Sequence, residues 1–180
     1  MVTLNSESKY NMKKYFLFAL MAVSLVSCEE ELTVNTPTFE AMKSYDFWRA
    51  TKITANHNNG DLIIVGANDS ENVTLFIDNY ELGKEYTLGT DNYNVATYSK
   101  TEDEKVYLYS TSSSTGKGYI KLDPVEKQTP GTISGTFYAE MVPVDAAMVL
   151  PDTPIVNLNK GVFFRIPLVY PSAQPEIPNP

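Results

Sequence analysis

The chain has 180 residues, and its 14 Lys and Arg against 22 Asp and Glu give a net charge of −8 at pH 7. This acidic balance leaves no basic stripe for phosphate, so nucleic-acid binding is disfavoured. With one cysteine and one histidine, the chain can form neither a disulfide framework nor a zinc site of Cys and His ligands. We expect no cofactor, no resident metal and no nucleic-acid partner.

Residues 12–31 have the layout of a secretory signal peptide. Two lysines precede an apolar run from Tyr15 to Val26, and a small residue stands before Cys28. The run is shorter than the roughly 17–25 apolar residues that a membrane-spanning helix needs. We therefore expect residues 1–27 to be a signal peptide, with Met12 as the true start.

The sequence Leu25-Val26-Ser27-Cys28 resembles the lipobox of bacterial lipoproteins, whose cysteine is lipidated and becomes the first residue of the mature chain. The resemblance implies two or three acyl chains on Cys28, and stable anchoring needs at least two, at about 0.8 kcal/mol per buried CH₂. Removing residues 1–27 leaves 153 residues with a net charge of −10. Such a chain is repelled by an anionic lipid surface, so the acyl chains on Cys28, and not a basic patch, would hold it to the membrane.

The remaining chain divides by composition into a tether, one domain and a tail. Residues 28–37 are polar without periodicity and predict a flexible tether. Its acidic run, Glu29 to Glu31, resembles the surface-export signals of Bacteroidetes lipoproteins, and a merely solvated linker is the alternative. Residues 38–170 predict a single β domain, and the Pro-rich residues 171–180 predict a disordered tail. We expect an outer-membrane lipoprotein that faces either the cell surface or the periplasm.

Short strands separated by turns are predicted from Thr38 onward. The segments are 39–42, 47–55, 62–65, 72–79, 84–88, 93–99, 106–110, 118–122, 131–142 and 161–168. The apolar segment 62–65 predicts a strand buried on both faces or nearly so. The cluster 56–61, which contains the only histidine, His57, predicts an exposed turn.

Alternation along three of these strands indicates which side chains point inward. In 72–79 the inward set is Val73, Leu75 and Ile77. In 131–142 one face carries Ile133, Phe137, Ala139 and Met141, and the other carries Thr132, Ser134, Thr136, Tyr138 and Glu140. In the last strand we expect Val162, Phe164 and Ile166 to point inward.

These patterns predict an all-β fold, because turns recur every several residues and no helical period is sustained. The expected architecture is an antiparallel β-sandwich of about ten short strands. A partly open β-barrel is the alternative.

Four motifs follow the lipobox in order: Phe47–Ala50, Gly83–Leu88, Ile133–Phe137 and Asn159–Phe163. With them, the chain from Phe39 to Leu168 resembles a family of small uncharacterised lipoproteins of Bacteroidetes, a domain of unknown function. The sequence departs from that family where a Gly is expected in the turn before the tryptophan. The resemblance implies an all-β fold and an envelope location, and it implies no chemistry.

Few residues point to catalysis. A nucleophilic site needs a positioned base, and His57 is expected at a turn tip. Paired carboxylates suit glycoside hydrolysis, but the sequence does not place any two of Asp78, Asp91, Asp103 and Glu140 together. The oxygen-rich turns 56–61 and 68–71 leave calcium binding open. We expect that the protein is not an enzyme.

Tyrosine is the one compositional hint of a binding surface, with 12 in the chain. Tyr107, Tyr109 and Tyr119 are the candidate aromatic contact face, because exposed rings on a sheet bring large rigid contact area at low entropy cost. Simple β-propensity is the alternative reason for these tyrosines. We expect a non-catalytic binding module for a glycan or an envelope protein. A purely structural lipoprotein and a hydrolase with an unrecognised carboxylate pair are the alternatives.

Overall fold

The computed structural model describes residues 36–112 and 114–170 of the chain. The predicted signal peptide, the predicted lipidation site Cys28, most of the predicted tether and the predicted tail 171–180 lie outside the described residues. Among the residues that are described, no helix is long and apolar enough to cross a membrane.

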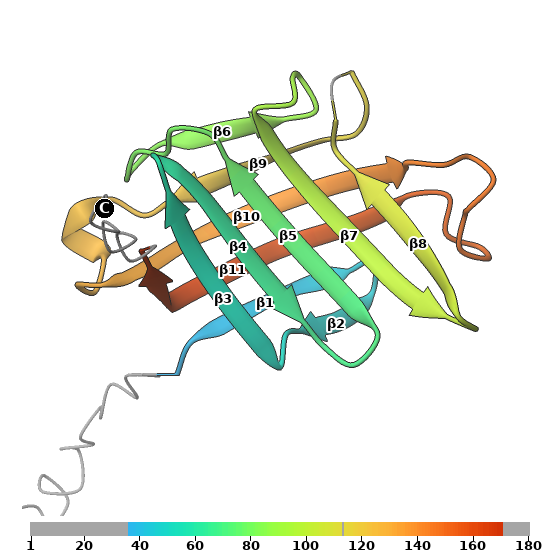
Figure 1. Ribbon diagram of the computed structural model, residues 1–180, viewed down its shortest axis with the longest axis horizontal. Coiled ribbons are helices and arrows are strands. Elements are labelled where there is room, and N and C mark those ends of the chain that lie inside the picture. Colours follow the sequence, from blue (N-terminus) through green and yellow to red (C-terminus); the bar gives the residue numbers. More distant parts are fainter. Residues whose placement is uncertain (1–35, 113, 171–180) are drawn as a thin grey trace, which may run out of the picture. The chain divides into compact units, whose positions relative to one another are not determined.

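Eleven β-strands and one 3₁₀ turn form the described part of the chain (Figure 1). The strands are β1 (Thr38–Lys43), β2 (Asp46–Arg49), β3 (Lys52–Asn58), β4 (Asp61–Ala67), β5 (Glu71–Ile77), β6 (Glu85–Leu88), β7 (Asn94–Glu102), β8 (Lys105–Ser110), β9 (Lys117–Leu122), β10 (Thr132–Pro143) and β11 (Val156–Val169). The 3₁₀ turn η1 (Val125–Lys127) connects β9 to β10.

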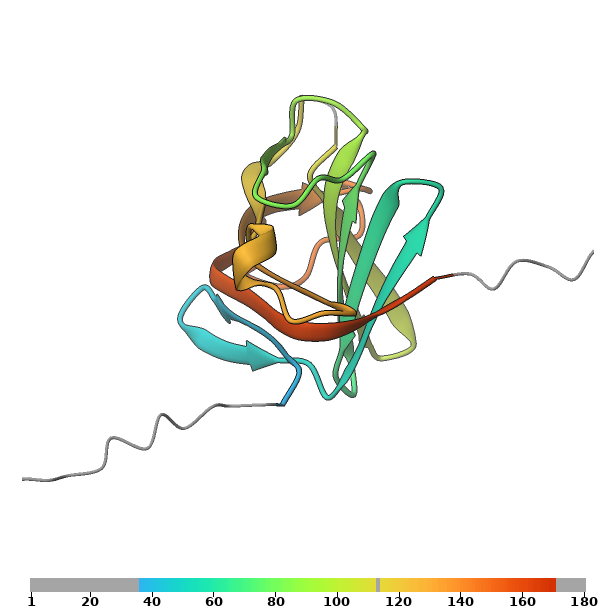
Figure 2. The same cartoon turned by 90° about the vertical axis from the view of Figure 1, so that its left-hand side faces the viewer.

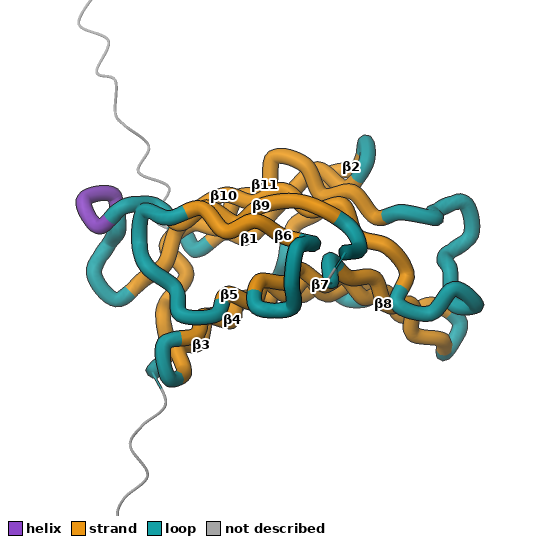
Figure 3. The backbone as a smooth tube through the Cα atoms, turned by 90° about the horizontal axis from the view of Figure 1, so that it is seen from above, coloured by secondary structure: helices purple, strands orange, loops and turns teal. Residues whose placement is uncertain are grey.

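The strands are arranged in two facing layers (Figure 3). The six-stranded layer has the order β2-β1-β11-β10-β9-β6, and the five-stranded layer has the order β3-β4-β5-β7-β8. The predicted all-β sandwich is therefore confirmed.

Two short pairings join the layers into one mixed sheet of 11 strands that is not a closed barrel. The end of β11 crosses to the five-stranded layer and lies beside β3 (Figure 2), where Leu168 pairs with Ala55. The end of β10 pairs with β8, where Val142 lies opposite Ser110. The β11–β3 pairing is parallel, which the expected antiparallel sandwich did not include.

Three aromatic rings of the core pack around the ring of Phe39. Its centroid lies 5.5 Å from that of Trp48, 5.4 Å from that of Phe137 and 6.5 Å from that of Phe163, all edge-on. Edge-on rings gain attraction beyond their buried area. From the opposite layer, Gly66 meets the same ring so closely that an added Cβ would lie 2.3 Å from it.

Alternation predicts the inward residues correctly only where the strand is regular. Val73, Leu75 and Ile77 of β5 are fully buried, as predicted. The apolar start of β4, predicted to be buried on both faces or nearly so, is fully buried on its inner face only. Leu62 and Ile64 are buried, whereas the residues between and after them are half-exposed on the outer face.

The predicted inward set of the last strand is also wrong in part. Ile166 is buried, but the side chain that enters the core beside it is Phe163 rather than Val162 or Phe164. The cause is a β-bulge, which sets two residues of one strand against one of its partner and reverses the alternation. Between Phe163 and Ile166, β11 advances three residues while β10 advances two.

The expected exposed turn at 56–61 is shorter than predicted, because β3 continues through His57 to Asn58. Only Asn59 and Gly60 form the turn, both with positive φ. The His57 side chain is half-buried, and its Nδ1 lies 3.3 Å from the hydroxyl of Tyr80.

Candidate functional site

Two tyrosines lie side by side on the outer face of the six-stranded layer. Tyr119 of β9 pairs directly with Tyr138 of β10, and their ring centroids lie 6.3 Å apart with planes tilted by 42°. Tyr119 is 37 % exposed, while its neighbour in sequence, Ile120, is buried in the core. Alternation along β9 and β10 therefore places both tyrosine rings on the solvent side.

A shallow groove runs from these rings across the layer to β1. Its volume is about 520 Å³, and its lining residues are Met42, Ser44, Tyr45, Tyr119, Tyr138, Asn159 and Lys160. We call it the tyrosine groove. Tyr45, in the turn between β1 and β2, is 97 % exposed and adds a third ring at the rim.

A second β-bulge forms the wall of the tyrosine groove beside Tyr138. Phe137 pairs with Gly161 and Ala139 pairs with Leu158, so Tyr138 lies opposite two residues of β11, Asn159 and Lys160. Bulges re-aim side chains in this way. An amide and an ammonium group are thus set beside an aromatic ring.

Polar groups continue from Tyr138 along the same face. The Tyr138 hydroxyl donates to Oε2 of Glu140 at 3.1 Å, and Lys117 Nζ lies 3.3 Å from the same oxygen. Burial and this hydrogen bond raise the pKa of Tyr138, so its hydroxyl is protonated at neutral pH. The groove thus combines apolar ring faces with hydroxyl, amide and ammonium groups, and the Glu140 carboxylate lies next to it; such groups can contact the faces and hydroxyls of a sugar.

The predicted contact face of Tyr107, Tyr109 and Tyr119 does not exist as one surface. Tyr109 is fully buried, and its hydroxyl accepts from the Leu150 amide at 2.8 Å and donates to the Thr153 carbonyl at 2.7 Å. Tyr107 packs partly buried against the core. Tyr107 and Tyr109 point inward from β8 of the five-stranded layer, whereas Tyr119 points outward from β9 of the six-stranded layer.

Sequence reasoning did not select Tyr138 and Tyr45 as site residues. For Tyr138 the signal was present, because the alternation in β10 places it on the outward face with Thr136 and Glu140. The pairing of β9 with β10 that joins it to Tyr119 is visible only in the structure.

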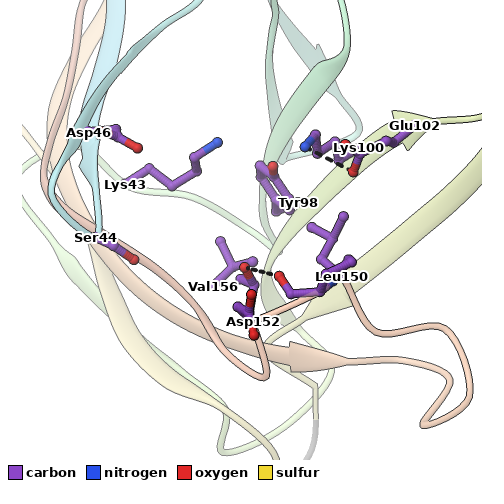
Figure 4. A pocket seen from close by; sticks show the side chains of 11 residues that line it. Lys43, Ser44, Asp46, Tyr98, Lys100, Glu102, Leu150, Asp152 and Val156 are labelled. Carbon is purple, nitrogen blue, oxygen red and sulfur yellow. Dashed lines mark hydrogen bonds and ion pairs between the residues drawn. The ribbon is translucent and has the colours of Figure 1, made fainter.

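A second cavity, of about 430 Å³, opens between the layers at the end of the sandwich where β1 and β7 meet the 150–153 loop (Figure 4). Lys43 extends from β1 toward Tyr98 of β7, and its Nζ lies 5.6 Å from the Tyr98 ring centroid. Lys100 and Glu102 form an ion pair of 3.1 Å at the rim. We call this cavity the end pocket.

A buried carboxylate, Glu71, joins the two layers beside the end pocket. Glu71 is 7 % exposed and forms an ion pair with Lys43 across the layers. It also accepts from the Tyr98 hydroxyl at 2.7 Å and from Asn68 Nδ2 at 3.3 Å. Burial opposes its ionisation, but Lys43 and these hydrogen bonds outweigh burial and lower the pKa of Glu71.

This carboxylate is unsuited to donate a proton to a leaving group. A glycosidase acid needs a raised pKa, whereas the pKa of Glu71 is lowered. The pKa of Tyr98, in contrast, is raised by burial and by the Glu71 carboxylate, so its phenol stays protonated. The arrangement fits a structural connection between β1, β5 and β7.

The four carboxylates named from the sequence lie on separate elements. Asp78 follows β5, Asp91 accepts from the backbone amide of Tyr93 at 2.9 Å, Asp103 lies in the β7–β8 turn and Glu140 lies on the outer face of β10. Over 36–112 and 114–170, no three His, Cys, Asp or Glu side chains gather in a way that could hold a metal ion. In the oxygen-rich turn 68–71, Asn68 Oδ1 accepts hydrogen bonds from the backbone amides of Ser70 and Glu71.

Residues 35–167 match the model of a protein family whose description is Domain of unknown function (DUF6252). The match covers well over half of the chain and includes all three tyrosines of the groove and the Lys160 bulge. It confirms an uncharacterised domain over the span that the sequence motifs indicated. Comparison with curated proteins and with solved structures found no match.

Proposed function

We propose that this chain, a member of the family described as Domain of unknown function (DUF6252), is a lipid-anchored envelope protein whose β domain binds a glycan without catalysis. The lipobox resemblance at Cys28 and the acidic run after it support an outer-membrane lipoprotein of the Bacteroidetes type. The lipid would fix the location, and the β domain would make the contacts.

The observation that carries the binding role is the tyrosine groove. Tyr119 and Tyr138 present adjacent rings on one sheet face, and polar groups of Asn159, Lys160 and Glu140 surround them. Sugars offer apolar ring faces flanked by hydroxyls, so they match rigid aromatic area with hydrogen-bonding groups at its edge. A purely structural protein would not need paired aromatic rings on a solvent-facing groove.

The hydrolase alternative has weaker support. Beside the end pocket, the buried carboxylate of Glu71 is held ionised by Lys43 and Tyr98. On the face of the tyrosine groove, Glu140 is paired with Lys117 and accepts a hydrogen bond from the hydroxyl of Tyr138. Neither carboxylate lies in the apolar setting that raises the pKa of a catalytic acid.

A glycan array with three alanine variants and one phenylalanine variant tests the proposal. Tyr119→Ala and Tyr138→Ala each remove one ring and should weaken binding about three- to tenfold, the range for one aromatic contact. Tyr93→Ala is the matched control, because Tyr93 is an exposed ring of the β6–β7 loop and does not line the groove. Tyr138→Phe separates ring contact from the hydroxyl.

We expect the wild type to bind a glycan, Tyr119→Ala and Tyr138→Ala to bind it more weakly, and Tyr93→Ala to bind it as the wild type does. Binding that is equal in all three variants would place the ligand elsewhere. Failure of the wild type to bind any glycan, together with crosslinking on live cells to an envelope protein through the groove, would replace the glycan with a protein partner.

A further inference from the structure

Two residues of β11 adopt left-handed backbone conformations inside a strand. Lys160 and Arg165 both have φ of +50°. Each lies in a β-bulge against β10: the first faces Tyr138, and the second faces Ser134. Lys160 and Arg165 are thus the irregular positions of a strand that is otherwise paired along its length.

Such positions are usually occupied by glycine, which has no Cβ, or by asparagine, whose short polar side chain can hydrogen-bond locally. Here both carry long cationic side chains instead. Backbone strain of this kind persists where the surroundings impose it and is found at functional sites. The two cations are therefore a feature that the fold maintains against a local cost.

The surroundings of each bulge are specific. The Arg165 amide donates to Ser134 Oγ at 2.9 Å, and the Ser134 amide donates to Gln128 Oε1 at 2.9 Å. The Arg165 guanidinium carbon lies 5.1 Å from the Phe164 ring centroid. Lys160 is exposed in the tyrosine groove and has no ion-pair partner among residues 36–112 and 114–170.

Charge is distributed unequally over the molecule. The described residues carry 11 Lys and Arg and 17 Asp and Glu. The outward strand residues of the six-stranded layer nevertheless carry five cations and three carboxylates, a net charge of +2: Arg49, Lys117, Lys121, Lys160 and Arg165 against Glu40, Glu85 and Glu140. The outer face of the five-stranded layer carries one of each sign, Lys52 and Asp61, and is neutral.

We propose that the ligand of the tyrosine groove is an acidic glycan, whose carboxylate or sulfate groups are bound by Lys160 and Arg165 while its rings contact Tyr119 and Tyr138. This inference rests on the proposed function. At about 3.3 Å per residue, the two cations lie roughly 16 Å apart along β11. An extended polymer with repeated acidic groups reaches both cations, and a monosaccharide does not.

Binding of two matched pairs of polymers to the purified full-length protein tests this inference. The pairs are polygalacturonate with its methyl ester, and dextran sulfate with dextran. Lys160→Asn and Arg165→Asn each remove the charge while keeping a side chain that tolerates the left-handed backbone. Lys160→Arg keeps the charge, and Lys52→Asn removes a charge from the other layer.

The acidic member of at least one pair should bind more tightly than its neutral partner, and binding should weaken as NaCl rises from about 0.05 M to about 0.5 M. Each Asn variant of β11 should weaken acidic binding about fivefold. Lys160→Arg and Lys52→Asn should bind as the wild type does. Both Asn variants should unfold at a temperature no lower than that of the wild type, because the backbone is relieved.

Equal binding of acidic and neutral members, lost in Tyr138→Ala but unchanged in the Asn variants, would overturn the acidic ligand and leave the glycan proposal standing. Acidic binding that Lys52→Asn weakens as much as Lys160→Asn would also overturn the inference. Absence of binding to all four polymers and to the glycan array would overturn both proposals.

Discussion

Replacing Lys43 by methionine tests the electrostatic connection between the two layers. The substitution keeps the length of the side chain and leaves the Glu71 carboxylate with only its bonds from Tyr98 and Asn68. Breaking a fully buried ion pair costs about 3–5 kcal/mol. The Lys43 side chain is 27 % exposed, so water screens the loss. We expect a decrease of about 1–3 kcal/mol in the free energy of unfolding at pH 7.

The effect should depend on pH with a definite sign. Because the folded state lowers the pKa of Glu71, its contribution to stability is present above the unfolded-state pKa of about 4.3 and is lost as pH falls below that value. In the variant, burial acts on Glu71 without the opposing lysine. The difference between wild type and variant should therefore be largest near neutral pH and should shrink toward about pH 3.

Urea denaturation followed by the fluorescence of Trp48 measures this difference, because Trp48 is the only tryptophan and is buried in the core. Lys84→Met is the matched control, since the Lys84–Glu81 pair is exposed to solvent and its loss should leave the free energy of unfolding nearly unchanged. A difference for Lys43→Met that is equally small, or one that stays constant from pH 7 to pH 3, would refute the reasoning.

Three further substitutions test other parts of the account. Gly161→Ala would place a Cβ 2.3 Å from the Phe137 ring, so thermal unfolding should show a loss of about 1–3 kcal/mol; an unchanged midpoint would contradict this packing. Tyr109→Phe removes both hydroxyl bonds to the 150–153 loop, and limited proteolysis should cut that loop faster, whereas an unchanged rate would show that the bonds do not hold it. Cys28→Ala should abolish incorporation of radiolabelled palmitate, and persistent labelling would refute the lipobox prediction.

How much of the fold follows from the sequence depends on the regularity of each strand. In β5 and in most of β10, alternation alone identifies the buried residues. The pairings of β5 are regular, and the extra residues of the two bulges between β10 and β11 belong to β11. In β11 two bulges interrupt the alternation, so Phe163 is buried where Phe164 was expected. The bulge residues are cationic rather than glycine, and no turn signal marks them.

The candidate site was less accessible to sequence reasoning. Tyr107, Tyr109 and Tyr119 are close in the chain, but the strands that carry them belong to different layers. Tyr138 lies beside Tyr119 because β9 pairs with β10, a strand order that periodicity does not specify. Periodicity does indicate which face each tyrosine occupies, and on that point the prediction for Tyr138 was correct.

Chemical-shift mapping by NMR tests most directly whether the outer face of the six-stranded layer is the binding face. The tightest-binding acidic polymer of the matched pairs, shortened to oligomers, is titrated into the labelled protein. The account predicts shifts at Tyr119, Tyr138 and the Asn159–Lys160 bulge, with the outward residues of β4 and β5 unchanged. Shifts confined to Tyr98, Lys100 and the other residues of the end pocket would contradict it.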